Sequence, residues 1–275
     1  MLKKHAAVEK LFVALLAAAL FSSFSAASET NCLPAPLRAR QLNGMKVEDS
    51  DGQKAGTVRN LVLDMNTGDL RYVIISDGGI LGVRSTLKLA PVQMMSAATA
   101  KSHTLAINTT STQWRGAPAF KYSSLAAIAE SDRANEIARY FRTSAKNVAR
   151  AEDVSLSKTG RNRPDLPVPL LKFGSDVIGM HVVNPKQEKM GEVVDLLVSF
   201  GEPRPAFAII SSGRLFHHDQ RYAVPLNTLT FSDNKLTWNA DTTALQNAPQ
   251  FDQVAWQSRG RNTSNHVYRY STPGE

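Results

Sequence analysis

The stretch from Gly44 to Pro91 reads GMKVEDSDGQKAGTVRNLVLDMNTGDLRYVIISDGGILGVRSTLKLAP. Runs such as Met45–Glu48 alternate apolar and polar residues, which is the period of a half-buried strand. Clusters of Asp, Ser, Asn and Gly separate these runs and favour turns, because Asp and Ser bond nearby backbone and Gly accepts positive φ. Together with the alternating piece at His103–Asn108, the stretch predicts about five or six short strands, which fit a small barrel because closure removes exposed edges.

Two local features refine this prediction. The alternation slips between Val58 and Leu61, as a β-bulge in that strand would produce. Ala117-Pro118-Ala119-Phe120 then breaks the strand pattern. In the following stretch, Leu125–Phe141, apolar residues recur at helical spacing with a polar interruption. We therefore expect one interrupted helix or two short amphipathic helices packed on the barrel.

The same landmarks recur in the second half of the chain, in the same order. Gly44-Met45 matches Gly179-Met180, Gly56-x-Val58 matches Gly191-x-Val193, Leu61 matches Leu196, Ile74-Ile75-Ser76 matches Ile209-Ile210-Ser211, Pro91 matches Pro225, and Ala117-Pro118-x-Phe120 matches Ala248-Pro249-x-Phe251. In the tail, Asn135, Ile137, Arg139 and Tyr140 fall on Asn265, Val267, Arg269 and Tyr270. The repeat predicts a second barrel, and the duplicated unit is interpreted as a barrel with a trailing helix.

These landmarks resemble the PRC-barrel domain family, in a tandem, exported bacterial form. The resemblance is carried by Gly44-Met45-x-Val47, Gly52, Gly56-x-Val58, Leu63-Asp64, Gly68, Tyr72-Val73-Ile74-Ile75 and Ala90-Pro91, and in the second copy by Val177-Ile178-Gly179-Met180, Gly191-Glu192-Val193, Ile209-Ile210 and Ala223-Val224-Pro225. It implies a mainly β fold with two small six-stranded barrels in tandem, each followed by a short helical segment. The family includes domains of a photosynthetic reaction centre subunit and of a ribosome maturation factor, which are not enzymatic and dock on larger assemblies.

The second copy departs from the first in its turns. Pro185-Lys186-Gln187 replaces the turn at Asp51-Gly52, and residues 201–205 (GEPRP) replace Asn66-Thr67-Gly68. What the two copies share is therefore the barrel, and whether they bind the same partner is left open.

The N-terminus has the three parts of a secretory signal peptide. Lys3, Lys4 and Lys10 form the positive region before the apolar run Leu11–Phe21, and Ser25-Ala26-Ala27 offers small residues for cleavage. The run is about half of the roughly 20 residues that span a bilayer, so we expect cleavage near Ala27 and a periplasmic protein. Cys32 is the only cysteine, which excludes an intramolecular disulfide and leaves an intermolecular one open.

The chain is accordingly divided into five segments. We expect a signal peptide at 1–27, an extended arm at 28–41, the first repeat with its trailing helix at 42–141, a basic proline-containing connector at 142–172, and the second repeat with its trailing helix at 173–275. The net charge is +8, and the leader holds three lysines and one glutamate, so +6 remains. The basic connector favours weak contact with an anionic lipid surface over nucleic acid, because it lacks interleaved aromatics.

Candidate sites for chemistry are few and each has a structural explanation. The turn carboxylates Asp49, Asp51, Asp64 and Asp69 are potential ligands of a hard cation, but such residues more often cap backbone amides. The other cluster is His217-His218-Asp219, with His181 preceding it. Adjacent strand residues face opposite sides, so the two histidines chelate one ion only from a loop.

No residue is assigned a catalytic, cofactor-binding or metal-binding role, and no cofactor is expected. Cys32 lies in the arm, and no serine sits in a Gly-x-Ser-x-Gly setting. The leading hypothesis is a non-enzymatic, exported cell-envelope protein that binds or scaffolds an envelope protein or assembly through two barrels. The alternative is a small-ligand or stress-protective carrier that uses the cleft between the repeats.

Overall fold

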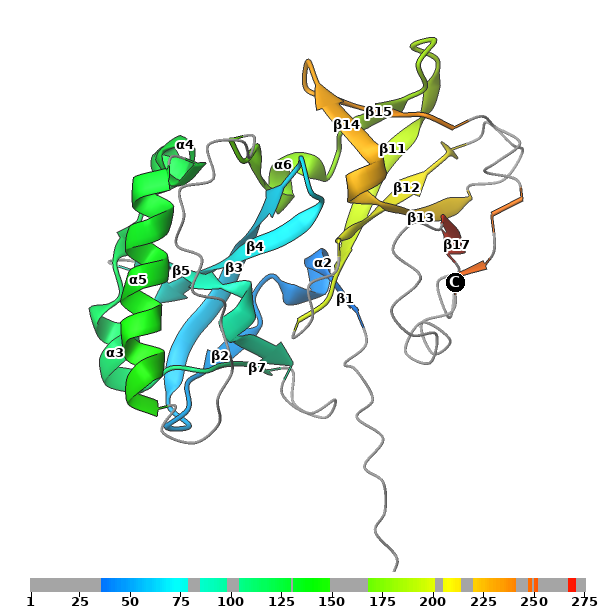
Figure 1. The fold of residues 1–275 in the computed structure, drawn as a ribbon. Coiled ribbons are helices and arrows are strands. Elements are labelled where there is room, and N and C mark those ends of the chain that lie inside the picture. Colours follow the sequence, from blue (N-terminus) through cyan, green and yellow to red (C-terminus); the bar gives the residue numbers. More distant parts are fainter. Residues whose placement is uncertain are drawn as a thin grey trace, which may run out of the picture. The chain divides into compact units, whose positions relative to one another are not determined.

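Two β-sheets, one for each sequence repeat, form the body of the protein (Figure 1). The computed structural model describes residues 36–78, 85–97, 104–129, 131–148, 168–200, 205–213, 220–240, 247–248, 250–251 and 267–270. Residues from Leu33 onward group into one structural unit. The mainly β fold with two β domains, predicted from the sequence, is confirmed.

The first sheet runs in the order β6-β7-β2-β3-β4-β5-β8. Its strands are β2 (Lys46–Glu48), β3 (Lys54–Asp64), β4 (Asp69–Asp77), β5 (Thr86–Pro91), β6 (Met95–Ala97), β7 (Thr104–Ile107) and β8 (Ala119–Phe120). A single 3-10 turn, η1 (Val92–Met94), leads from β5 into β6. Most neighbours are antiparallel, whereas β2 lies parallel to β7.

The long strand β3 carries the predicted bulge. Its register with β4 shifts between Val58 and Asn60, within the interval that the broken alternation indicated. Just before the bulge, Gly56 has φ +151°, and a Cβ there would lie 2.3 Å from the Ser76 carbonyl oxygen. Gly191 meets Ser211 at the same 2.3 Å. Both glycines are therefore required by the close approach of two backbones, which explains why the repeats share them.

Helices cover one side of the first sheet (Figure 1). They are α3 (Ser111–Gly116), η2 (Tyr122–Ser124), α4 (Leu125–Ala129) and α5 (Ser131–Val148). Thr110 begins α3 by accepting a hydrogen bond from the Gln113 amide. The Trp114 indole donates to the Ala55 carbonyl at 2.6 Å, and its ring lies 6.5 Å from that of Phe141. The stretch expected to form one interrupted or two short amphipathic helices forms α4 and α5, and α5 is longer than expected because it continues to Val148. Both helices pack on the barrel through buried residues such as Ile128 and Ile137.

The second sheet repeats this arrangement with a different edge. Its strands are β10 (His181–Val183), β11 (Lys189–Val198), β12 (Phe207–Ser211), β13 (Arg221–Pro225), β14 (Leu229–Ser232), β15 (Lys235–Trp238), β16 (Gln250–Phe251) and β17 (Tyr268–Tyr270), and η4 (Leu226–Thr228) joins β13 to β14. The order is β14-β15-β10-β11-β12-β13-β17-β16. In the first repeat β8 pairs with β5, but in the second β17 pairs with β13 and β16 lies outside it.

The two matched tails therefore differ in secondary structure. Arg139 and Tyr140 lie in helix α5, whereas Arg269 and Tyr270 lie in strand β17. The segment 252–266, which precedes β17 and was expected to be helical, lies outside the described residues. In the second repeat this part of the tail pairs with the sheet edge β13, whereas in the first repeat the equivalent edge, β5, pairs with β8.

Two short segments pair with the sheet of the other repeat. Strand β1 (Leu37–Arg38) and helix α2 (Ala39–Leu42) precede the first barrel, yet β1 pairs with β11 of the second. Strand β9 (Leu171–Phe173) and helix α6 (Gly174–Val177) precede the second barrel, yet β9 pairs with β3 of the first. The expected arm (28–41) thus ends in ordered structure, and the expected connector (142–172) begins inside α5 and ends inside β9.

The apolar cores of the two repeats merge. One cluster of contacting buried side chains includes Val47 and Ile74 of the first barrel and Val182, Leu196 and Leu226 of the second. A smaller cluster is confined to the second repeat and contains Leu197, Phe207, Ile209, Ala223 and Tyr268. The exchanged segments join this shared core, because Leu42 and Val177 are 1% and 0% exposed.

Candidate functional site

The turn carboxylates of the first repeat cap backbone amides. Asp49 Oδ1 accepts from the amides of Asp51 and Gln53 at 3.0 and 2.9 Å, and its Oδ2 accepts from the Ser111 hydroxyl at 2.6 Å. Asp51 Oδ2 accepts from the Ser111 amide at 2.7 Å. Asp64 Oδ1 accepts from the Asn66 amide at 3.1 Å. The bonds of Asp49 and Asp51 hold the β2–β3 turn against the start of α3, and the bond of Asp64 lies in the β3–β4 turn. For these three residues this is the capping role weighed above.

The histidine cluster is only partly described. His181 begins β10 and is exposed, whereas His217, His218 and Asp219 lie outside the described residues. Cys32 and most of the basic connector (149–167) lie outside them too. Within the described part of the chain, no three His, Cys, Asp or Glu side chains come together in a way that suits a metal ion.

Lys88 forms a buried polar centre that sequence reasoning missed. It is 3% exposed, and its Nζ donates to Asp77 Oδ2 and the Trp114 carbonyl at 2.6 Å each and to the Arg115 carbonyl at 3.0 Å. The same Nζ lies 5.3 Å from the centre of the Trp114 ring. The ammonium therefore satisfies the last carbonyls of α3, where a positive charge is favoured. Every proton of the ammonium has an acceptor, so this lysine fixes α3 on the barrel.

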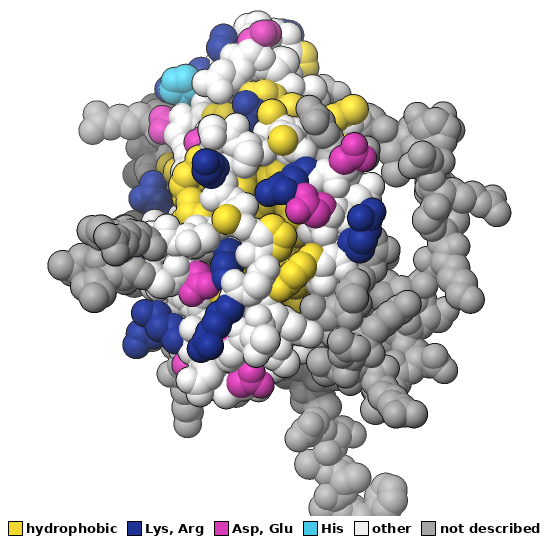
Figure 2. Space-filling view, turned by 90° about the vertical axis from the view of Figure 1, so that its left-hand side faces the viewer, with side chains coloured by type: hydrophobic (Ala, Val, Ile, Leu, Met, Phe, Trp, Pro, Cys, Tyr) yellow, Lys and Arg dark blue, Asp and Glu magenta, His cyan; other side chains and the backbone are white. Residues whose placement is uncertain are grey.

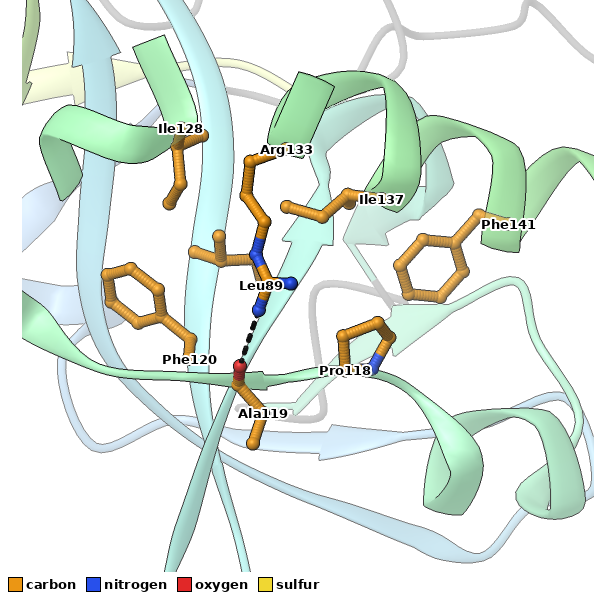
Figure 3. Close-up of a pocket in the computed structure, with 8 residues that line it drawn as sticks. All are labelled: Leu89, Pro118, Ala119, Phe120, Ile128, Arg133, Ile137 and Phe141. Carbon is orange, nitrogen blue, oxygen red and sulfur yellow. Dashed lines mark hydrogen bonds between the residues drawn. The ribbon is translucent and has the colours of Figure 1, made fainter. Parts of the chain in front are cut away.

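A small hollow lies between the helices and the β5–β8 edge of the first repeat (Figure 3). Its lining is mostly apolar and comprises Leu89, Pro118, Ala119, Phe120, Ile128, Arg133, Ile137 and Phe141. Arg133 reaches across it and donates to the Ala119 carbonyl at 3.4 Å, as Figure 3 shows. The hollow holds about 10 Å³, roughly the room that one water molecule needs and far less than a small-ligand pocket. It is a packing seam between α5 and the barrel.

An aromatic cluster is the most partner-like surface feature of the described residues. It consists of Phe120 in β8, Tyr122 in η2 and Phe173 in the exchanged strand β9. The Tyr122 ring lies 5.9 Å from that of Phe120 and 5.1 Å from that of Phe173, in edge-to-face geometry. Tyr122 nevertheless remains 43% exposed. Such exposure is informative because Tyr presents both an apolar ring and a hydroxyl to a partner.

Two basic residues, Arg59 and Lys121, lie near Tyr122 in space or in sequence. Burial raises the pKa of the Tyr122 phenol, against the opposing effects of Arg59 and of a hydrogen bond with Asn60. Arg59 and Lys121 are both exposed. On the face that carries α3, α4 and α5, both basic and acidic side chains lie around apolar patches (Figure 2). The cluster thus combines a neutral tyrosine with nearby positive charge, which suits a protein surface that offers apolar and acidic groups.

Backbone and side chains of the two repeats contact each other directly at several described residues. The Ala206 amide donates to the Gly68 carbonyl at 2.8 Å, and Asp69 bridges to Pro205. A Cβ placed on Gly174 would lie 3.3 Å from Leu61 and 3.5 Å from Leu196. These contacts join the two repeats directly at the described residues of the junction, where the carrier hypothesis placed its ligand.

Comparison with known families identifies both barrels. The model of the PRC-barrel domain matches residues 37–113 and 171–242, which together make up more than half of the chain. The chain belongs to the PRC-barrel family. Each match begins at an exchanged segment, so the strand and helix that precede each barrel are part of the PRC unit. No curated protein matched the chain in a sequence comparison.

The family assignment bears on activity in one respect. PRC-barrel domains are generally non-catalytic modules, and no enzyme family matched the chain. Among the described residues, no helix is both long and apolar enough to cross a membrane.

Proposed function

We propose that this PRC-barrel protein is an exported, non-enzymatic component of the cell envelope that binds or scaffolds an envelope protein or assembly. The observation that carries the proposal is the aromatic cluster of Phe120, Tyr122 and Phe173, which both repeats build together and which leaves Tyr122 exposed. It is supported by membership of a family of generally non-catalytic domains. The partner rests its apolar groups on the cluster and its acidic groups near Arg59 and Lys121.

The docking part of the proposal is tested by comparing capture with three forms of the mature protein. Tyr122→Ser removes the exposed ring, whereas Val168→Ser removes an apolar side chain that is 72% exposed and lies outside the cluster. After cross-linking in envelope extracts, the wild type and Val168→Ser retain the same partner, and Tyr122→Ser loses most of it. Equal recovery by all three forms refutes docking at the cluster.

The export part rests on the leader sequence and has its own readout. Mass spectrometry of the protein from a periplasmic fraction is expected to find an N-terminus at Ser28, after cleavage following Ala27. A protein that retains Met1 and stays in the cytoplasm contradicts export.

Weak binding to anionic lipid is a secondary part of the proposal. Seven basic residues lie in segment 142–172, namely Arg142, Lys146, Arg150, Lys158, Arg161, Arg163 and Lys172. Each basic residue near an anionic surface contributes about 1 kcal/mol, and salt screens the attraction. The protein is therefore expected to co-sediment with phosphatidylserine-containing vesicles at low salt and not with neutral vesicles. Equal sedimentation with both contradicts this contact.

A further inference from the structure

The two repeats exchange their N-terminal segments at equivalent positions: β1 pairs with β11, and β9 pairs with β3. Gly44 and Gly179 are 135 positions apart, and the same offset relates Leu37–Arg38 to Lys172–Phe173. Arg38 pairs with Leu197, and Phe173 pairs with Val62. Val62 and Leu197 are also 135 positions apart. Each repeat therefore gives the same segment to the same place on the other repeat, as the two subunits of a domain-swapped dimer do.

Each exchanged helix is held by the residue at the bulge of the other barrel. Asp195 Oδ1 accepts from the Arg40 amide at 3.2 Å and from the Leu196 amide at 2.9 Å. Asn60 Oδ1 makes the equivalent bonds at the same distances, with the amides of Ser175 and Leu61. The register shifts at Val58/Asn60 and Val193/Asp195 place both side chains at the bulge. The bulges thus serve the exchange, because they aim a polar side chain at the incoming helix.

The two crossings differ in chemistry. At the second barrel, Arg38 Nε donates to Asp195 Oδ2 at 2.8 Å, and the Asp195 side chain is fully buried. At the first barrel, Phe173 takes the place of Arg38 and packs on Phe120 and Tyr122. A neutral Asn60 there takes the place of Asp195, and its Nδ2 donates to the Ser175 hydroxyl at 2.8 Å.

This difference penalises pairing between like repeats. If two second repeats paired, Phe173 would stand where Arg38 stands, and the buried Asp195 carboxylate would lose its cation. An unpaired buried charge is strongly destabilising. If two first repeats paired, Arg38 would meet neutral Asn60, and the Phe120–Tyr122 pair would lose Phe173. Each crossing is satisfied only by the other type of repeat.

We propose that the exchanged segments, rather than the covalent connector, hold the two repeats together, and that this interface selects a first repeat for a second one. The surface that each repeat presents fits the other repeat, whether it belongs to the same chain or to a second copy. Arg38, Asp195 and Phe173 are the residues that set this specificity. The inference is independent of the partner proposed above, since it concerns only contacts within this protein.

The test is to cut the connector in the full-length protein. A protease recognition sequence is inserted between Ser157 and Lys158, and the folded protein is cleaved and analysed by native mass spectrometry at micromolar concentration. The expected result is one particle that contains one copy of each fragment. Separation into free fragments, or particles that contain only one type of fragment, overturns the proposal.

The same cleaved protein tests whether a first repeat can pair with a second repeat from another copy of the chain. One batch is labelled with heavy isotopes, mixed with an unlabelled batch, unfolded in urea and refolded. About half of the refolded pairs are expected to combine a labelled with an unlabelled fragment, since random recombination of equal amounts is the mass-action outcome. Recovery of unmixed pairs alone contradicts it.

Substitutions at the Arg38 crossing test the specificity residues. Arg38→Ala is expected to raise the dissociation constant of the cleaved pair at least roughly tenfold, because the buried Asp195 carboxylate loses its ion-pair partner. Adding Asp195→Asn recovers most of this loss, since the amide copies Asn60 and carries no charge. Arg133→Ala is the matched control, because its ion pair with Glu136 lies within the first repeat. If adding Asp195→Asn to Arg38→Ala does not lower the dissociation constant again, the proposed role of the ion pair is overturned.

Discussion

Lys88 shows how one buried charge fixes a helix to a barrel. It lies in β5 (Thr86–Pro91) between Leu87 and Leu89. Lys88 is buried because α3 covers that side of β5 and supplies its last carbonyls as acceptors. Sequence reasoning missed this residue since the covering helix lies outside the strand that the pattern describes.

At Lys88 the expected effect of substitution is large. Lys88→Met keeps most of the side-chain volume but leaves Asp77 without its cation and the α3 carbonyls without a donor. Breaking one partner of such a pair costs about 3 kcal/mol, less to the extent that the Asp77 side chain, 26% exposed, regains water. Urea unfolding measures the loss. The exposed control Lys121→Met is expected to change stability by no more than about 0.5 kcal/mol, and equal effects at both lysines contradict the assignment.

Four tyrosines make stability sensitive to alkaline pH. Burial raises the pKa of Tyr72, Tyr122, Tyr140 and Tyr222 above the ordinary value. A raised pKa means that the folded state holds the phenolic proton more tightly than the unfolded chain does. The contribution is fully present below the unfolded pKa of about 10 and is lost as pH rises through the folded values.

Unfolding free energy is therefore expected to fall as pH is raised above about 10, from the range in which these phenols stay protonated. Urea titrations across this range measure it. Tyr140→Phe removes one of the four phenols, whose hydroxyl donates to the Gln113 carbonyl at 2.5 Å, and is expected to flatten the decline. A decline of the same size in that variant contradicts the role of Tyr140.

At the scale of elements, the barrels were predictable and the exchange was not. Alternation, turn residues and shared glycines sufficed for the strands because they are local signals, and the bulge in β3 followed from the slip after Val58. The pairing of β1 with β11 has no local signal, since two residues such as Leu37 and Arg38 carry no period. The aligned polar residues Asn60 and Asp195, one at each bulge, are the clue that the sequence does contain.

The exchange predicts that a substitution that disrupts one exchanged segment lowers the amide protection of the other repeat. Leu37→Pro removes a backbone donor and distorts β1, which pairs with β11. We expect hydrogen–deuterium exchange to accelerate in β11 of the second barrel more than in β3 of the first. Lys172→Pro, at the equivalent position of β9, is expected to produce the reverse pattern. Loss of protection confined to the repeat that follows each substituted segment contradicts the exchange.

At the scale of the whole molecule, the two barrels are joined by a shared core and by the exchanged segments. They share the apolar cluster that includes Val47 and Val182, and each barrel is completed by a segment of the other. Neither repeat can lose its structure without exposing part of the shared core of the other. We therefore expect one cooperative unfolding transition rather than two.

This expectation is tested most directly by hydrogen–deuterium exchange of the intact protein at increasing urea concentrations. Peptides from β4 (Asp69–Asp77) report on the first barrel, and peptides from β12 (Phe207–Ser211) report on the second. The reciprocal exchange predicts that both sets lose protection at the same urea concentration and with the same dependence on urea. Two separate midpoints, with one barrel open while the other stays protected, would contradict it.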